Sequence, residues 1–420
     1  MIEIQLAKGV KDVNSDEKIQ MNKIIKIIKE VFEKYGFNPL QTPIIERYET
    51  LSAKYAGGSE ILKETFKLND QGKRELALRY DLTVPLARYI AMNSNLKMPF
   101  KRYEIGEVFR DGPLKPGRYR QFIQCDADAV GSSNMLADAE CLAIASEIFS
   151  KLNFKFIIRV NNRKILDSIL EAFDILEDKR DDAILSIDKL AKIEVSGVKK
   201  ELEEKGFKNI DKLLNLIFTN DLNDIKKLIK NKNGVNEVNE VLKYCKLLNV
   251  KNVKFDASLA RGLSYYTATI FEVFAKNSKI TSSIAGGGRY DNMIGDFIGN
   301  RKVPAVGISF GLDAILDVMK ESLKENNKSV VEFYIIPINT LNESLDVLTK
   351  LRQNNFKCDI DLNNKSISKN LEYANYLNIS YVILIGKEEL KLKKIKLRDM
   401  KTGKEKLMSL NELILKFKKF

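Results

Sequence analysis

The run from Arg118 to Val130, RYRQFIQCDADAV, carries polar side chains at every second position. In a β-strand, successive side chains point to opposite faces of the sheet. One face would then present Arg118, Arg120, Phe122, Gln124, Asp126 and Asp128. Along this face, cations come first, then an aromatic ring, an amide and carboxylates. This order suits an extended ligand that has a phosphate at one end, a base that can stack in the middle and an amine at the other end. The alternative is a solvent-facing strand whose mixed charges pair across the sheet.

Two arginines flank the loop before this strand-like run. Arg110 ends KRYEIGEVFR, and DGPLKPG separates it from Arg118. This pattern predicts a β-hairpin with a long loop. Guanidinium groups donate forked hydrogen bonds to phosphate, so both arginines are candidate phosphate ligands. The sequence has no GxxxxGK[ST] motif and no GxGxxG after a strand, which argues against Walker-type and dinucleotide-binding folds.

Two further segments offer groups for an ammonium group, a phosphate and a polar ring. In ALRYDLTVP, alternation would place Asp81 and Thr83 on one face, where they suit an ammonium group; alternatively, Asp81 caps a following helix. In LARGLSYYTATIFEV, Arg261 can neutralise charge in a phosphate transition state, and Tyr265 or Tyr266 can hydrogen-bond a polar ring. The alternative there is a surface arginine beside core tyrosines.

Three glycines in AGGGRYD lack Cβ atoms, so the backbone at Gly286, Gly287 and Gly288 can approach a ligand closely. Taken alone, the same segment is compatible with a tight turn.

Histidine is absent from the 420 residues. Without imidazole the chain cannot form a Ser-His-Asp or Cys-His relay or a His-ligated metal site. Its chemistry must come from carboxylates, cations, hydroxyls and backbone amides. The 70 Lys and Arg residues exceed the 57 Asp and Glu residues, which gives a net charge of +13. Such a charge admits a polyanionic partner such as RNA, although lysine-rich helix faces give the same sum.

Helices and strands are expected to position these groups in two domains. Asn14 with Glu17 predicts the start of a helix that ends at Gly36, and a second helix follows Ser133. Strand-like runs lie between the helices, at 74–80, 100–110 and 118–130. A sheet with helices against it is therefore expected.

The first domain is expected to span 1–325 and to be interrupted at about 165–250 by a helical insert rich in Lys, Leu, Ile, Asp and Asn. Glycine and strand signals return after the insert, so the sheet resumes there. Over 330–420, strands alternate with helices, which predicts a small α/β domain.

The cysteines and the chain's hydrophobic pattern indicate a cytosolic protein. Four cysteines lie far apart without a CxxC pair, which favours reduced, buried thiols: Cys125, Cys141, Cys245 and Cys358. No apolar run reaches about 18 residues, and the start lacks a signal-peptide pattern, so neither membrane spanning nor export is expected.

These motifs resemble those of histidyl-tRNA synthetases, which are class II aminoacyl-tRNA synthetases, over nearly the whole chain. GFNPLQTPIIE is similar to motif 1, EVFRDGPLKPGRYRQFIQCD to motif 2 and PAVGISFGLDAIL to motif 3. LARGLSYYTATIFE and AGGGRYD resemble the family's histidine-specific segments. The resemblance implies an α+β class II catalytic domain built on an antiparallel sheet and a C-terminal anticodon-binding domain. It also implies a homodimer that uses ATP, Mg²⁺, L-histidine and tRNA(His).

Carried over to this sequence, the family pattern implies that Arg110 contacts the α-phosphate of ATP, Phe122 stacks on adenine and Arg118 lies near the phosphate tail. Arg261 is implied at the reacting carboxylate and α-phosphate, so Arg261, Arg110 and Gln124 are the expected catalytic residues. The resemblance places the other residues around histidine: Asp81, Thr83 and Gln124 at its amino-acid end, Asp128 and Tyr266 at its imidazole, and Tyr265 lining the pocket.

The sequence departs from the family pattern at three positions. Asp81 and Asp128 stand where bacterial members carry glutamate, and Ala314 stands where motif 3 normally has an arginine that contacts the ATP tail. Either another cation substitutes for that arginine, or activity is reduced. Two alternatives follow: a histidyl-tRNA-synthetase-like regulatory subunit of ATP phosphoribosyltransferase, and a catalytically inactive tRNA-binding paralogue.

Overall fold

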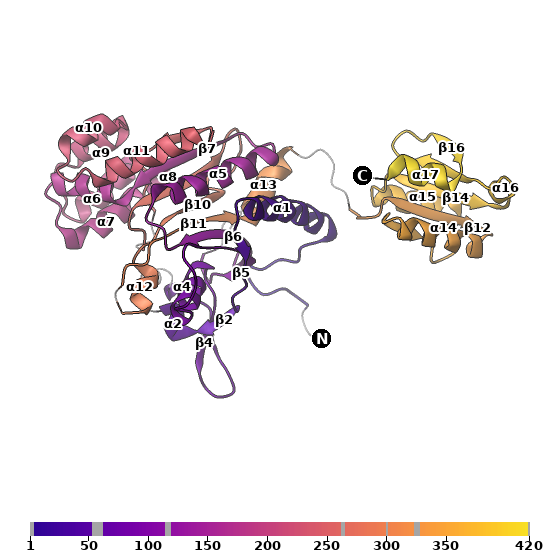
Figure 1. Cartoon of the computed structure of the whole chain (residues 1–420), viewed down its shortest axis with the longest axis horizontal. Helices are drawn as coiled ribbons and strands as arrows, with labels where there is room; N and C mark the ends of the chain where they lie inside the picture. The colour runs from indigo at the N-terminus through magenta and orange to yellow at the C-terminus, as the bar shows by residue number, and fades with distance from the viewer. Residues whose placement is uncertain are drawn as a thin grey trace. The chain divides into compact units, whose positions relative to one another are not determined.

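The computed structural model describes residues 4–52, 62–113, 119–261, 265–299, 301–322 and 328–418. The chain divides into two compact units (Figure 1). One comprises Met1–Lys11 with Lys23–Ser322, and the other comprises Asp12–Asn22 with Leu323–Phe420.

An eight-stranded sheet forms the centre of the first unit. Its strands follow the order β1 (Asn38–Pro39), β5 (Phe100–Phe109), β6 (Gln121–Val130), β11 (Ala305–Gly311), β10 (Ala285–Arg289), β9 (Thr269–Ala275), β7 (Phe156–Asn162) and β8 (Val253–Phe255). Neighbours from β5 to β7 are antiparallel, whereas the edge strands β1 and β8 pair in parallel. The predicted antiparallel sheet and its continuation after the insert are confirmed.

Helices cover one face of this sheet. They are α1 (Ser15–Lys34), α5 (Met135–Lys151) and α13 (Leu312–Ser322). The ring of Phe310 on β11 lies 5.8 Å from Phe32 of α1 and 5.7 Å from Phe149 of α5. Phe310 pairs with Cys125 of β6, which is fully buried on that face. The opposite face, with the even-numbered residues of β6, is therefore the face left for a ligand.

The predicted helix starts agree with the structure. The side chain of Asn14 accepts a hydrogen bond from the backbone N–H of Glu17 at 3.2 Å, and Asn134 caps α5 by accepting from Leu136 at 2.8 Å. These bonds satisfy N–H groups that have no partner within the helix.

The run expected to be a helical insert contains α6 (Arg163–Ala172), α7 (Glu177–Ile187), α8 (Leu190–Glu204), α9 (Ile210–Thr219), α10 (Leu222–Leu228) and α11 (Asn233–Leu247). Figure 1 shows α6, α7, α9 and α10 gathered at one end of the first unit. Their apolar faces share a hydrophobic cluster that includes Ile169, Ile184 and Leu213. Glu194 interrupts α8 with φ of 57°, so the helix is kinked there.

Smaller elements complete the first unit. A three-stranded sheet contains β2 (Ile45–Arg47), β4 (Glu75–Leu78) and β3 (Lys67–Asn69), in that order. The short helices are α2 (Tyr48–Ser52), α4 (Thr83–Met92) and α12 (Met293–Phe297).

The second unit is an α/β fold, as expected from 330–420. Its elements are β12 (Phe333–Ile338), α14 (Leu341–Gln353), β13 (Cys358–Ile360), α15 (Ile367–Tyr376), β14 (Tyr381–Gly386), α16 (Lys387–Lys391), β15 (Ile395–Asp399), β16 (Glu405–Met408) and α17 (Leu410–Phe417). The first three strands are parallel. The antiparallel strands β15 and β16 were not anticipated; their turn contains Gly403 at φ of 71°, a conformation that favours glycine.

All four cysteines are buried free thiols, as predicted. Within the described ranges, no helix combines the length and apolar character needed to cross a membrane.

Candidate active site

The predicted polar face of β6 lies among matching residues of its neighbouring strands. Cross-strand pairing forms three rows: Asp128 with Arg102 and Gly307, Asp126 with Glu104 and Ser309, and Gln124 with Gly106 and Gly311. Because directly paired residues share a sheet face, these side chains all lie on the face opposite α1 and α5. The predicted alternation of Phe122, Gln124, Asp126 and Asp128 is therefore present.

Two of the three glycines of β10 make room for side chains that arrive from a separate loop. An ideal Cβ on Gly286 would lie 2.0 Å from Nη1 of Arg261, and one on Gly288 would lie 2.8 Å from Cδ1 of Tyr266. The expectation that this backbone approaches a ligand closely is thus wrong for these two positions, since protein side chains occupy the space. The tight-turn alternative is also wrong, because AGGGR forms strand β10.

The register links Arg261 to the β6 residues. Gly286 pairs with Ser309, which pairs with Asp126, so Arg261 lies over the same cross-strand row as Asp126. Two strand spacings of about 4.8 Å separate β10 from β6, a lateral distance of roughly 10 Å. A small zwitterion fits between a guanidinium and carboxylates at that separation.

Arg261 is oriented by an acidic partner. Its Nη1 donates to Glu272 Oε1 at 3.1 Å, and the hydroxyl of Ser283 donates to the same oxygen at 3.1 Å. The guanidinium also lies 5.4 Å from the ring of Tyr266. Tyr265 and Tyr266 are adjacent, with ring centroids 4.6 Å apart. Residues 262–264 of LARGLSYY lie outside the described part of the chain.

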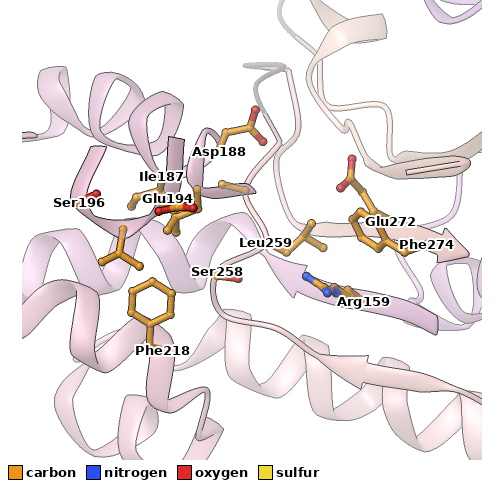
Figure 2. A pocket seen from close by; sticks show the side chains of 13 residues that line it. Arg159, Ile187, Asp188, Glu194, Ser196, Phe218, Ser258, Leu259, Glu272 and Phe274 are labelled. Atoms are coloured by element: carbon orange, nitrogen blue, oxygen red, sulfur yellow. The ribbon is translucent and has the colours of Figure 1, made fainter. Parts of the chain in front are cut away.

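A cavity of about 670 Å³ adjoins Arg261 on the side of Glu272. Figure 2 shows that it lies between the insert and the sheet, with Asp188, Glu194 and Phe218 on one side and Arg159 and Glu272 on the other. A second cavity, of about 370 Å³, is lined by residues that include Tyr266, Lys164 and Lys302.

Asp128 is held by two buried groups. Tyr290 donates its hydroxyl hydrogen to Oδ1 at 2.6 Å, and Arg102 forms an ion pair with Oδ2 at 3.0 Å. An ideal Cβ on Gly307 would lie 1.9 Å from Oδ1, so a side chain at 307 would displace this carboxylate. Burial raises the pKa of Asp128, although Arg102 and Tyr290 oppose the shift. The alternative interpretation of β6 is therefore half right. Charges do pair across the strands, but the pairs are buried, whereas the alternative placed them in solvent.

The expected strand geometry of Asp81 and Thr83 is wrong. Thr83 is the first residue of α4, and Asp81 Oδ1 accepts hydrogen bonds from the backbone N–H groups of Thr83 at 3.1 Å and Val84 at 3.0 Å. Asp81 thus satisfies the free donors at the helix start, as the alternative held. Burial raises the pKa of Asp81, and Arg110 and Asp128 are among the charges that act on it. The carboxyl is therefore near the β6 face as well as being a cap.

Arg110 lies at the end of β5 against two aromatic rings. Its guanidinium is 4.2 Å from the ring centroid of Tyr80 and 5.0 Å from that of Phe122. Nε donates to the carbonyl of Tyr80 at 3.3 Å. The guanidinium therefore covers part of the ring that was assigned to adenine. Arg118, the second predicted phosphate ligand, lies outside the described residues.

Gln124, Ser309 and Asp126 form a hydrogen-bonded series. Gln124 Nε2 donates to Ser309 Oγ at 2.7 Å, and the Ser309 side chain hydrogen-bonds to the Asp126 carboxyl. Burial and the neighbouring Asp128 raise the pKa of Asp126 to about 8, against the opposing effect of Arg102.

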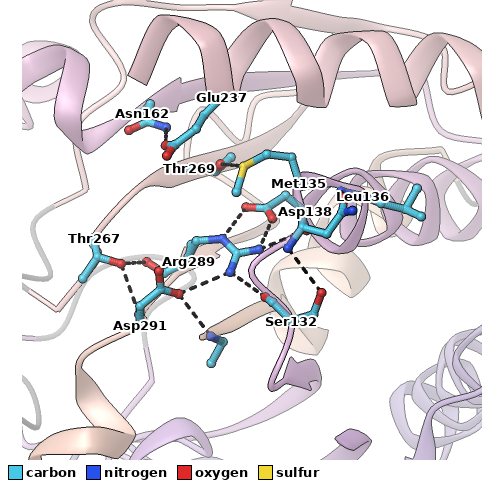
Figure 3. Close-up of polar contacts among 12 residues, drawn as sticks. Ser132, Met135, Leu136, Asp138, Asn162, Glu237, Thr267, Thr269, Arg289 and Asp291 are labelled. Carbon is cyan, nitrogen blue, oxygen red and sulfur yellow. Dashed lines mark hydrogen bonds and ion pairs between the residues drawn. The ribbon is translucent and has the colours of Figure 1, made fainter. Parts of the chain in front are cut away.

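Arg289, the arginine of AGGGRYD, has a structural place. It forms an ion pair with Asp138 of α5 and donates to the carbonyl of Ser132 at 2.8 Å and to Asp291 at 3.3 Å (Figure 3). Arg289 is 1% exposed, so these partners compensate a charge that burial would otherwise disfavour. This network joins β10 to the start of α5.

The region of the missing motif 3 arginine contains a different cation. Ala314 lies in the first turn of α13 beside Asp313, whose carboxylate is 3.4 Å from the ammonium group of Lys11. Asp313 also accepts from the backbone N–H of Ile123 at 3.4 Å, and Lys11 lies 4.3 Å from the Tyr119 ring. The start of α13 is thereby joined to β6 and to the N-terminal segment.

Several residues of this site were missed from the sequence: Arg102, Glu104, Ser309, Tyr290 and Glu272. The sequence did hold a signal for Arg102 and Glu104. They are charged residues at alternate positions of KRYE, on the strand predicted to pair with β6. The others depend on pairings between distant segments, which no local pattern indicates.

Comparisons with known proteins agree with this architecture. Residues 9–315 match the family model described as histidyl-tRNA synthetase, and residues 332–420 match the anticodon binding domain. The chain is 45% identical over 424 residues to histidine–tRNA ligase 1 of Bacillus cereus, covering 98% of this chain and 99% of that protein. It is 40% identical over 435 residues to histidine–tRNA ligase of Clostridium tetani, covering 99% and 98%.

A solved structure is also similar. The crystal structure of histidyl-tRNA synthetase from Nostoc sp. PCC 7120 superimposes with a TM-score of 0.87 at 31% identity, covering 99% of this chain and 100% of that chain. The chain therefore belongs to the histidyl-tRNA synthetase family.

Proposed function

We propose that the protein is an active histidine–tRNA ligase. It condenses L-histidine with ATP to histidyl-adenylate and pyrophosphate, then transfers the histidyl group to the 3′ end of tRNA(His). One observation carries this proposal. Gln124, Asp126 and Asp128 lie on one face of the sheet, and Arg261 lies over Gly286 on the same face. The strands that hold them, β6 and β10, are two strand spacings apart.

ATP would bind at the Phe122 end of this face. Arg110 contacts the α-phosphate, Phe122 stacks on adenine and Arg118 contacts the phosphate tail. Since Arg110 lies 5.0 Å from the Phe122 ring without ligand, adenine either displaces this guanidinium or stacks on the other face of the ring. Bound with ATP, Mg²⁺ would neutralise part of the charge of the phosphates, and we assign no protein residue to it.

Histidine would bind between β6 and Arg261. Asp81, Thr83 and Gln124 hold its amino-acid end, while Asp128 and Tyr266 contact its imidazole and Tyr265 lines the pocket. Asp81 Oδ1 is occupied by the start of α4, so its second oxygen is the one proposed for the substrate. The Arg102 and Tyr290 bonds hold Asp128 in one orientation, which supports a fixed position for the imidazole.

Adenylate formation brings two anions together, the histidine carboxylate and the α-phosphate. Arg110 and Arg261 offset their repulsion, while Gln124 fixes the position of the amino acid. Charge grows on the phosphate oxygens as the carboxylate attacks, so cations held in place by Glu272 and the aromatic rings stabilise the transition state. The proposed mechanism needs no side-chain nucleophile, which agrees with a chain that has no histidine.

The two parts of the chain have separate proposed roles. We take residues 1–325 as the catalytic domain, with the insert at about 165–250, and 330–420 as the part that binds the anticodon of tRNA. The match of 332–420 to the anticodon binding domain supports the second assignment. By family resemblance we also propose a cytoplasmic homodimer.

Exchange of radioactive pyrophosphate into ATP tests the proposed activity. We expect exchange with histidine and not with the other amino acids, followed by histidylation of tRNA. Histidine binding without exchange would instead identify a regulatory subunit, an alternative favoured only by Ala314. Binding of tRNA without histidine-dependent exchange would identify an inactive paralogue.

A further inference from the structure

Three buried acceptors on the β6 face have no hydrogen-bond partner among the described residues. They are Oε1 of Gln124, Oδ1 of Asp126 and Oδ2 of Asp128. The last of these is in an ion pair with Arg102 at 3.0 Å, which leaves the first two as the acceptors without a partner of any kind. Asp126 is 3% exposed, so water does not readily replace the missing donor. A buried acceptor without a donor costs about 1–3 kcal/mol, more when charged, so such groups commonly mark a ligand site.

The hydrogen bonds around Ser309 leave both acceptors available for a ligand. Gln124 Nε2 donates to Ser309 Oγ at 2.7 Å, so the amide oxygen is turned away from this serine. The Ser309 hydroxyl in turn hydrogen-bonds to Asp126. One serine therefore fixes the positions of two neighbouring acceptors, which are two residues apart on one strand.

The charges that face Asp126 are mostly negative. They are Glu104 and Arg102 on β5, Asp128 on β6 and Asp81 before α4. Arg102 already pairs with Asp128 at 3.0 Å. Glu104 likewise pairs with the buried Arg79 at 2.7 Å. Both of these arginines are thus paired with other carboxylates, and the raised pKa of Asp126 is consistent with a carboxyl that has no ion-pair partner of its own among the described residues.

We propose that Asp126, together with Gln124, binds the α-ammonium group of the substrate histidine. This inference rests on the proposed function and adds to it a residue that supplies the counter-charge. An ammonium group has three donors, enough for the free oxygens of Asp126 and Gln124 and one more acceptor. An imidazole nitrogen has a single N–H and cannot satisfy both.

The position of Asp128 supports this assignment over the imidazole. Asp128 already has a cation beside it, because Arg102 forms an ion pair with Oδ2 at 3.0 Å, although Oδ2 accepts no hydrogen bond and so can still contact the imidazole. Oδ1 of Asp126 has neither a hydrogen bond nor an ion pair among the described residues, so it is the carboxylate oxygen that lacks a counter-charge. Asp126 lies between Gln124 and Asp128 along β6, so an amine at Asp126 and a ring nearer Asp128 fit one extended histidine molecule.

Calorimetric binding to the full chain tests the assignment. The ligands are L-histidine and imidazole propionate, which lacks the amine. In Asp126→Asn, which keeps the side-chain shape, we expect the Kd for L-histidine to rise about 10- to 100-fold, as loss of a charged hydrogen bond predicts. The Kd for imidazole propionate should stay within about twofold of the unaltered protein.

Asp296→Asn is the matched control. Asp296 lies in α12 and also has a pKa raised by burial. We expect unchanged Kd values for this variant. An unchanged Kd for L-histidine in Asp126→Asn would overturn the proposal, and so would an equal loss for both ligands, because that would assign Asp126 to the imidazole.

A second measurement needs no variant. Titrations of the unaltered protein at pH 7 in buffers of different ionisation enthalpy count the protons released on binding. A bound ammonium would ionise Asp126, whose pKa is about 8. Each count is corrected for the imidazolium protons of the free ligand, taken from that ligand's own titration, and after this correction L-histidine should release up to about one proton more than imidazole propionate. Equal corrected release by the two ligands would contradict the proposal even if Asp126→Asn fails to fold.

Pyrophosphate exchange by the unaltered protein is measured in parallel. If histidine causes no exchange of pyrophosphate into ATP, the proposed function fails. The ammonium assignment is then still tested by the Kd values for L-histidine and imidazole propionate. If exchange is normal and Asp126→Asn binds L-histidine normally, only the ammonium assignment fails.

Discussion

Arg261 lies over Gly286, at a place where a Cβ on residue 286 would be 2.0 Å from Nη1 of the guanidinium. Gly286→Ala should therefore displace Arg261 without removing it. We expect kcat for pyrophosphate exchange to fall about 10²- to 10³-fold, as when a transition-state contact is lost. Gly72→Ala is the control, because its Cβ would meet only flexible side chains at 3.3 Å or more. Normal exchange in Gly286→Ala would show that the position of Arg261 is not needed.

Arg261→Ala should lower kcat far more than it raises the Kd for histidine, because charge on the phosphate grows in the transition state. Arg261→Lys keeps the charge but loses the forked geometry, so it should recover only part of the rate. Steady-state exchange and equilibrium binding measure the two effects separately. A loss confined to binding would contradict the role assigned to Arg261.

Asp128→Ala should reduce both selectivity and stability. It leaves the imidazole without its proposed partner, so discrimination between histidine and other amino acids should fall. It also leaves Arg102, which is fully buried, without its 3.0 Å ion pair, at a cost of about 3–5 kcal/mol.

Tyr290→Phe is the comparison for Asp128→Ala, since it removes only one hydrogen bond to Asp128 and should cost about 1 kcal/mol. Thermal unfolding and exchange with each amino acid measure the two effects. Unchanged discrimination in Asp128→Ala would contradict its proposed contact with the imidazole.

Ala314→Arg restores a cation in the first turn of α13. If ATP phosphates lie near this turn, the KM for ATP should fall about 2- to 10-fold, the range of one exposed guanidinium contact. Ala314→Gln is neutral and of similar reach, so it should leave the KM unchanged. Equal KM values for the two variants would show that no phosphate lies near residue 314.

Asp126 should make stability depend on pH. Its pKa is about 8 in the folded chain against 3.8 as the ordinary value, so the folded state binds more protons between these limits. Its contribution to the free energy of unfolding is complete below about pH 4 and falls by up to about 1.4 kcal/mol per pH unit until about pH 8. Thermal unfolding at pH 5 and pH 7.5 should show a smaller decrease for Asp126→Asn than for the unaltered protein. An identical decrease would argue that Asp126 ionises normally.

The local part of the site could be predicted from the sequence. Alternation along β6 depends only on the strand's own geometry, so Phe122, Gln124, Asp126 and Asp128 were assigned correctly to one face. The same rule failed for Asp81 and Thr83 because the strand ends before them and a helix begins at Thr83. A helix cap and a strand end share short polar residues, and nothing local separates the two.

The non-local part could not be predicted. Ser309 determines which oxygens of Gln124 and Asp126 stay free, and its pairing with β6 follows from the register of the whole sheet. The glycines of β10 were recognised as places of close approach, but only the packed structure shows that Arg261 and Tyr266 occupy them.

The hydrogen bond between Gln124 and Ser309 joins residues 185 positions apart. During translation, strand β6 leaves the ribosome long before its neighbour β11, and the insert is synthesised in between. The chain must close this long loop before the two acceptors face a common pocket, and closure of distant segments is the slow part of folding. Binding of histidine should accordingly arise late in the life of the nascent chain, and it can serve as a reporter that the central sheet has been completed.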